Sequence, residues 1–113
     1  MTLLEELMQI EHRLAGGRGD VYRDVLADDA LVIVPGAVLG KGECVAAMDA
    51  SSGWDSVVLE APRLIESAGF ASVVYRFTGE RGETAYSAVL ASTYRLPDRR
   101  LVLHQQTPDV PSS

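Results

Sequence analysis

The chain has 113 residues, which is the usual size of one domain. Sixteen acidic residues against ten basic ones give a net charge of −6, which argues against a nucleic-acid partner. No apolar run approaches the roughly 20 residues that a membrane helix needs, and 47% hydrophobic content is typical of a folded chain. We therefore expect one soluble domain over 1–108, followed by a disordered tail over 109–113.

The first half of the chain carries helical patterns. Apolar residues recur with helical spacing from Leu3 to Leu14, and Gly16-Gly17 ends that pattern. Asp20 is a good N-cap for a shorter helix, and a β-branched run that stops at Pro35-Gly36 indicates a buried strand. The predicted elements are helices over 3–15, 21–27 and 43–50 and a strand over 30–34.

The second half changes to the two-residue period of β-strands. Pro62 within the first of these strands indicates an edge strand or a bulge. The predicted strands cover 57–66, 70–78, 84–96 and 100–107. Short turns between them make an antiparallel meander, on which the three helices bury their apolar faces. The prediction is an α+β fold, a curved antiparallel sheet packed against three N-terminal helices, with a conical cavity between them.

Cysteine and histidine are too few and too dispersed to indicate a metal site. Cys44 is the single cysteine, so an intrachain disulfide is excluded and a cytoplasmic location is expected. The patterns HxH, HExxH and CxxC are absent from the sequence, as are glycine-rich phosphate loops. We therefore expect no metal and no cofactor.

Four stretches carry a resemblance to a known superfamily: LLEELMQIEHRLAGGRGD, YRDVLADDALVIVPG, KGECVAAM and STYRLPDRRLVLHQQTP. In this order they resemble the nuclear-transport-factor-2-like (NTF2-like, cystatin-like) superfamily, and within it the small DUF4440/SnoaL-like group. The resemblance implies the NTF2-like cone and a homodimer through the outer face of the sheet. It does not imply one activity, because this fold hosts isomerases, dehydratases, epoxide hydrolases, cyclases and non-catalytic modules.

The catalytic residues of the superfamily's ketosteroid isomerases are absent. Those enzymes use a carboxylate at the end of the first strand, a tyrosine in the first helix and a protonated aspartic acid in a later strand. Aligned through LADDA, these positions fall on Val34, Ile10 and, more loosely, Ser92. Valine and isoleucine can neither take a proton nor stabilise an oxyanion. The epoxide-hydrolase pattern also lacks a partner carboxylate beside Arg81 and Glu83.

Glu11 falls inside the apolar arc of the first helix. A carboxylate on a buried face must be partnered or protonated, because burial of an isolated charge is costly. One interpretation makes Glu11 an acid or base in the pocket. The other makes it a structural residue, bound to Arg76, another arginine or the backbone.

The last strand has two possible orientations. Its alternation predicts two faces, with Leu101, Leu103 and Gln105 on one and Val102, His104 and Gln106 on the other. The two leucines favour the first face against the helices, which places Gln105 near the pocket and His104 on the outer face. In the reverse orientation, His104 becomes the acid–base candidate.

Aromatic residues supply the remaining candidates. Tyr75 and Tyr86 lie on strand faces that can both point inward and hydrogen-bond a ligand, and Trp54 can cover the cavity mouth; ordinary core packing is the alternative for each. The expected ligand contacts are Val34, Trp54, Tyr75, Tyr86, Ser92 and Gln105, with Glu11 and His104 as catalytic candidates.

Three functions remain open from the sequence. The first is a small-molecule-binding domain with a mainly apolar pocket, whose partner is a small apolar molecule with few polar groups. The second is a SnoaL-like cyclase, isomerase or dehydratase that acts on a polyketide or terpenoid-like metabolite by acid–base catalysis. The third is a structural dimerisation module whose pocket is filled by side chains.

Overall fold

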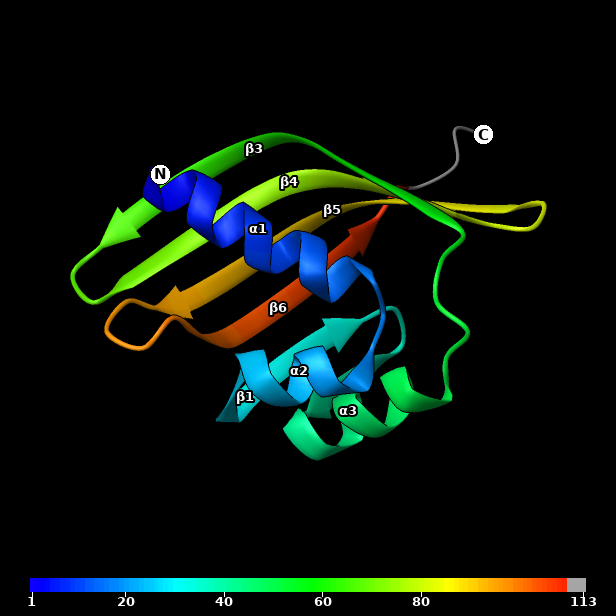
Figure 1. Ribbon diagram of the computed structural model, residues 1–113, viewed down its shortest axis with the longest axis horizontal. Helices are drawn as coiled ribbons and strands as arrows, with labels where there is room; N and C mark the ends of the chain where they lie inside the picture. Colours follow the sequence, from blue (N-terminus) through cyan, green and yellow to red (C-terminus); the bar gives the residue numbers. More distant parts are fainter. Residues whose placement is uncertain (110–113) are drawn as a thin grey trace.

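The computed structural model describes residues 1–109 and consists of three helices and a six-stranded sheet (Figure 1). The helices are α1 (Leu3–Ala15), α2 (Gly19–Val25) and α3 (Lys41–Ala50). The strands are β1 (Leu26–Val34), β2 (Ala37–Gly40), β3 (Ser56–Ser67), β4 (Phe70–Arg81), β5 (Thr84–Arg95) and β6 (Arg100–Pro108).

The start of α1 is fixed by side-chain hydrogen bonds to its first turn. Thr2 and Glu5 form a capping box: Glu5 N donates to Thr2 Oγ1 at 3.1 Å, and Thr2 N donates to Glu5 Oε1 at 3.2 Å. The acidic first turn and the basic last turn also suit the helix dipole. The apolar face of α1, including Leu7, Met8 and Leu14, is buried against the sheet.

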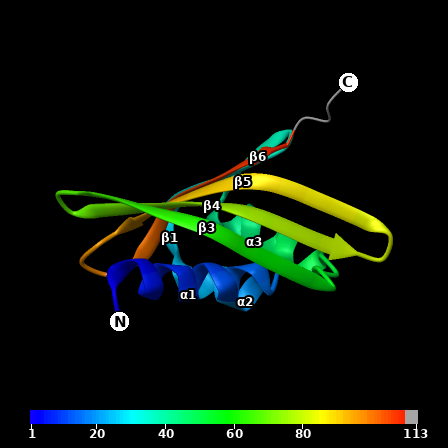
Figure 2. The same ribbon diagram turned by 90° about the horizontal axis from the view of Figure 1, so that it is seen from above.

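The strands follow the order β2-β1-β6-β5-β4-β3, and the sheet does not close. Every neighbouring pair is antiparallel except β1 and β6, which are parallel. The expected antiparallel meander over β3 to β6 is confirmed, while β1 makes the sheet as a whole mixed. The long strands of the meander curve over α1 (Figures 1 and 2).

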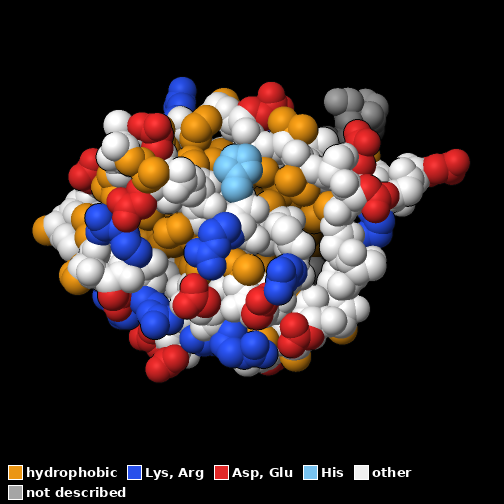
Figure 3. All heavy atoms as spheres, in the orientation of Figure 1, with side chains coloured by type: hydrophobic (Ala, Val, Ile, Leu, Met, Phe, Trp, Pro, Cys, Tyr) orange, Lys and Arg blue, Asp and Glu red, His pale blue; other side chains and the backbone are white. Residues whose placement is uncertain are grey.

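The helices cover only one face of the sheet. Figure 2 shows α1 and α2 on the same side, and α3 packs against α2 and β1. Alternate residues of β4 and β5 point towards the helices and are buried, among them Val73, Phe77, Leu90 and Tyr94. Figure 3 views the helix side, where acidic and basic side chains are interspersed.

Several predicted boundaries are corrected. Arg18, not Asp20, is the N-cap of α2, which ends at Val25 rather than at residue 27, and β1 begins at Leu26 rather than at residue 30. The short strand β2 was not expected. It forms because the turn at Pro35-Gly36, with Gly36 at φ 83°, returns the chain onto β1.

The remaining expectations concern the edge and the end of the sheet. β3 is an edge strand, and its register with β4 shifts between Glu60 and Arg63, beside Pro62, as predicted. The tail expected to be disordered lies outside the described residues except for Asp109. That residue pairs with Arg76 at 2.6 Å and its amide donates to the carbonyl of Ser87 at 3.0 Å.

Candidate functional site

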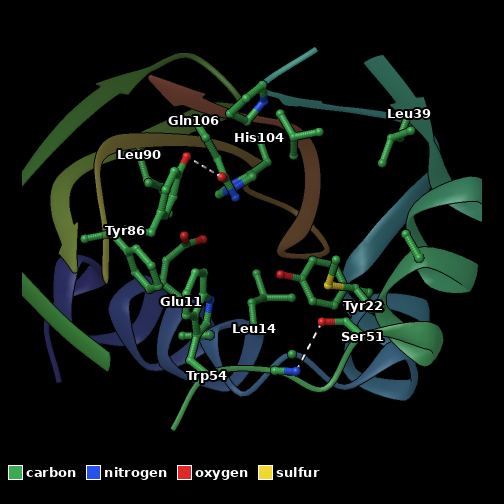
Figure 4. Close-up of a pocket in the computed structure, with 18 of the residues that line it drawn as sticks. Glu11, Leu14, Tyr22, Leu39, Ser51, Trp54, Tyr86, Leu90, His104 and Gln106 are labelled. Carbon is green, nitrogen blue, oxygen red and sulfur yellow. Dashed lines mark hydrogen bonds between the residues drawn. The ribbon is translucent and has the colours of Figure 1, made fainter. Parts of the chain in front are cut away.

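A cavity of about 400 Å³ lies between the helices and the concave face of the sheet. Its wall is mainly apolar and includes Leu14, Leu39, Met48, Phe77 and Leu90. Figure 4 shows polar side chains entering this space from different elements, with Glu11 from α1, Tyr22 from α2, Tyr86 from β5, and His104 and Gln106 from β6.

Glu11 is the buried carboxylate of the site, with 1% of its surface exposed. It accepts three hydrogen bonds from hydroxyl groups. Tyr75 Oη donates to Oε1 at 2.6 Å, Ser92 Oγ donates to the same oxygen at 2.9 Å, and Tyr94 Oη donates to Oε2. Within residues 1–109, Glu11 uses neither of the partners considered from the sequence, an arginine or the backbone; Arg76 pairs with Asp109 instead.

The hydrogen bonds around His104 form a directed chain. The hydroxyl hydrogen of Ser92 goes to Glu11, so Ser92 Oγ must accept from His104 Nδ1 at 2.8 Å. His104 Nε2 then accepts from Gln106 Nε2 at 3.4 Å, and Gln106 Oε1 accepts from Tyr86 Oη at 3.0 Å. The chain connects Tyr86 to Glu11, and it requires a neutral imidazole with its hydrogen on Nδ1.

Burial sets the protonation of the site. Desolvation lowers the pKa of His104, against the opposing effect of the Glu11 carboxylate, and so favours the neutral ring that the chain requires. Burial, followed by the charge of Glu11, raises the pKa of Tyr75 and of Tyr94. Both phenols therefore remain protonated and act as donors to the carboxylate.

An aromatic cluster borders the cavity beside this chain. Trp54 stacks on Tyr86 with ring centroids 5.8 Å apart and packs against Phe77 at 5.9 Å. The guanidinium of Arg81 lies 4.9 Å from the centroid of Trp54, and its Nε donates to the Gly53 carbonyl at 2.5 Å. Trp54 is thus held at the cavity by contacts with β4 and β5.

Leu101 faces the helices as expected, but a bulge in β6 reverses the expected orientation of the residues that follow it. Thr93 pairs with Leu103 but Tyr94 pairs with Leu101, so Val102 is an extra residue in β6. Alternation restarts after the bulge. His104 consequently faces the cavity and is 6% exposed, while Leu103 and Gln105 face outward and are exposed. The expectation that Gln105 lies near the pocket is therefore wrong. Gln106, not Gln105, lines the cavity.

The other candidate residues lie together. Val34, Trp54, Tyr75 and Tyr86 line the cavity, and Ser92 is fully buried behind it, between Glu11 and His104. Sequence reasoning did not single out Tyr22, Tyr94 or Gln106 as site residues. Tyr94 follows Ser92 by two positions, so the two residues share one face of the strand, and this spacing could have indicated that Tyr94 belongs to the site.

No group of three metal-ligating side chains occurs within residues 1–109. Over the same range, the helices are too short and too polar for any of them to cross a membrane.

No family model and no curated protein matches the sequence, but solved structures do match the fold. A candidate ketosteroid isomerase from Parabacteroides distasonis superposes with a TM-score of 0.83 at 11% identity, covering 97% of this chain and 90% of that one. An NTF2-like protein from Cytophaga hutchinsonii gives 0.79 at 17% identity, covering 96% and 100%. A candidate SnoaL-like polyketide cyclase from Jannaschia gives 0.58 at 16% identity, covering 96% and 90%. The chain has the nuclear-transport-factor-2-like fold.

Proposed function

We propose that the protein is a small-molecule-binding domain whose ligand is mainly apolar and carries one or two polar groups. The observation that supports this proposal is the cavity of about 400 Å³, walled by apolar side chains and containing a few converging polar groups. Small-molecule sites typically have this size and composition. The likeness in fold to a candidate ketosteroid isomerase and a candidate polyketide cyclase is in keeping with it.

Thermal melting with a panel of apolar probes tests this proposal. A ligand that binds only the folded state raises the melting temperature. Val34→Trp should abolish the rise, because Val34 lines the cavity and the larger ring fills part of it. Val38→Trp is the matched control, since Val38 is exposed on β2 away from the cavity wall. No shift for any probe, or an equal shift in both variants, would contradict binding in this cavity.

The directed chain from His104 to Glu11 favours a second candidate function, an acid–base enzyme of the SnoaL-like type. A proton taken up at His104 Nε2 can be relayed to the Glu11 carboxylate, because Nδ1 already donates to Ser92 Oγ and Ser92 Oγ already donates to Glu11. Glu11 and His104 would be the proton-transferring groups, with Tyr75 and Tyr86 as their hydrogen-bonding neighbours. The substrate class would be a polyketide or terpenoid-like metabolite.

Proton exchange in heavy water tests the enzymatic candidate without knowledge of the product. Polyketide-like and terpenoid-like ketones are incubated with the protein, and deuterium incorporation is followed by nuclear magnetic resonance. Glu11→Gln should reduce the rate at least about a hundredfold if Glu11 is the base. An unchanged rate in this variant would remove Glu11 from that role.

We also infer a homodimer through the outer face of the sheet. The helices leave this face uncovered, and Leu31 and Leu103 lie beside one another on it, 48% and 37% exposed. Their row continues across the sheet through Thr93 and Ser72, without a charged side chain. A third candidate, a structural dimerisation module, rests on this face alone and predicts that the cavity binds nothing.

A further inference from the structure

The carboxylate and the imidazole of the cavity already make most of their hydrogen bonds within the protein. An ionised carboxylate offers about four acceptor positions, and three of those of Glu11 are occupied by Tyr75, Ser92 and Tyr94. His104 uses both ring nitrogens within the protein. The strongest acceptor of the site is therefore largely satisfied before any ligand enters.

Donors, in contrast, remain available. Within residues 1–109, Tyr22 Oη takes part in no hydrogen bond, and Figure 4 shows it directed into the cavity from the α2 side. Gln106 Nε2 has a second hydrogen that His104 does not use. Arg81 uses Nε on Gly53, and its terminal nitrogens make no ion pair within the described part of the chain.

The surroundings of Tyr22 make its hydroxyl selective. Leu14, Leu39 and Met48 line the same cavity and offer no side-chain oxygen or nitrogen. Burial is the largest effect that raises the pKa of Tyr22, and the nearby Cys44 and Glu11 side chains add to it, so the phenol remains a donor at neutral pH. A hydrocarbon that fills the cavity would displace water from this hydroxyl and leave it unsatisfied, which is costly.

From this inventory we propose that the ligand is an apolar carbonyl compound whose oxygen accepts a hydrogen bond from Tyr22 Oη. The inference rests on the proposed binding function and specifies the ligand's polar group as an acceptor. Ammonium groups are disfavoured, because transfer of a charge from water into this cavity is costly and the Glu11 carboxylate that could pair with it already accepts three hydrogen bonds. The apolar body of the ligand lies against Leu14, Leu39 and the aromatic cluster of Trp54, Phe77 and Tyr86.

Three probes of nearly one shape test the inference: 2-acetylnaphthalene, 2-ethylnaphthalene and 1-(2-naphthyl)ethylamine. Calorimetric titration should rank the ketone first, the hydrocarbon second and the amine last. The ketone should bind at least about fivefold more tightly than the hydrocarbon, as expected for one buried hydrogen bond gained rather than lost. In Tyr22→Phe the two affinities should become equal, while the melting temperature of the unliganded protein does not fall, because the hydroxyl has no hydrogen-bond partner among residues 1–109.

Thr107→Val is the control, since it removes a hydroxyl from an exposed position of β6 that does not line the cavity. The ratio of ketone to hydrocarbon affinity should remain that of the unaltered protein. Equal affinities for ketone and hydrocarbon in the unaltered protein, tightest binding of the amine, or a ratio that persists in Tyr22→Phe would each overturn the inference and leave the binding function standing. Binding of none of the three probes would overturn the binding function with it.

Discussion

At the scale of single residues, Glu11 determines how the polar interior is built. Three hydroxyl groups from two strands point their hydrogens at its carboxylate, which joins α1 to β4 and β5. Their arrangement requires an acceptor at both carboxylate oxygens. An amide in this position would present a donor to one of the hydroxyls and weaken the connection between helix and sheet.

Glu11→Gln should therefore lower the free energy of unfolding by about 1–3 kcal/mol, the range for a buried polar group that loses its partner. Urea denaturation followed by circular dichroism measures the change. Glu66→Gln is the control, because Glu66 is exposed on β3 and such surface substitutions usually stay within about 0.5 kcal/mol. Equal stability of the two variants would show that the carboxylate is not a structural acceptor.

His104 should make stability depend on pH. Burial lowers its pKa in the folded protein, so the unfolded chain binds the proton at a higher pH than the folded chain does. The contribution of neutral His104 is complete above about pH 6.5, the ordinary imidazole value, and is lost as the pH falls below it towards the folded pKa. Acidification below this value should therefore lower the free energy of unfolding.

His104→Asn tests this dependence, because an asparagine amide can donate to Ser92 and does not titrate. Unfolding free energies are compared from about pH 7.5 to about pH 5. The unaltered protein should lose stability relative to the variant on acidification, and His12→Asn controls for the removal of one imidazole. Parallel curves for the unaltered protein and His104→Asn would contradict the lowered pKa.

At the scale of elements, the position of Trp54 depends on a strand residue without a side chain. A Cβ on Gly79 of β4 would lie 2.7 Å from Trp54 Cδ2 and 3.0 Å from Phe77 Cε1. Real Cβ atoms do not approach other atoms so closely, so any side chain at Gly79 would displace the indole ring from its stack on Tyr86.

Gly79→Ala should shift the emission of Trp54, the single tryptophan, to longer wavelength and destabilise the fold by about 1–3 kcal/mol. Gly42→Ala is the control, and it is expected to raise the free energy of unfolding rather than lower it. A Cβ on Gly42 meets no atom within 4 Å, and alanine in helix α3 should stabilise by about 0.4–1 kcal/mol. An unchanged emission spectrum in Gly79→Ala would mean that Trp54 is not held over β4.

Elements with a regular period could be predicted from the sequence, and the exceptions have physical causes. The boundaries of α1 follow from its apolar spacing and from the pair Thr2 and Glu5. The orientation of His104 did not follow, because one bulge residue, Val102, shifts the alternation and leaves no mark in the pattern of residue types. Glu11 was found as a break in an apolar face, whereas its hydroxyl partners depend on strand pairing that a single sequence does not specify.

At the scale of the whole molecule, the two faces of the sheet have different surroundings. The concave face carries the helices and the cavity, while the row of Leu31, Leu103, Thr93 and Ser72 on the other face meets no element within residues 1–109. Stable interfaces bury about 800 Å² on each partner, and a sheet face spanning several strands can provide such an area. The cavity and the proposed dimer surface therefore lie on opposite sides of one layer.

Leu103→Arg should convert the proposed dimer into a monomer, because it places a charge at the centre of the uncharged row, where association would bury it. Sedimentation velocity measures the mass, and probe binding should persist, since Leu103 is not among the cavity-lining residues. Gln9→Arg adds the same charge on an exposed position of α1 and should leave the mass unchanged. A monomeric unaltered protein, or a dimer that survives Leu103→Arg, would contradict this interface. Loss of probe binding together with the dimer would instead show that the second copy completes the cavity.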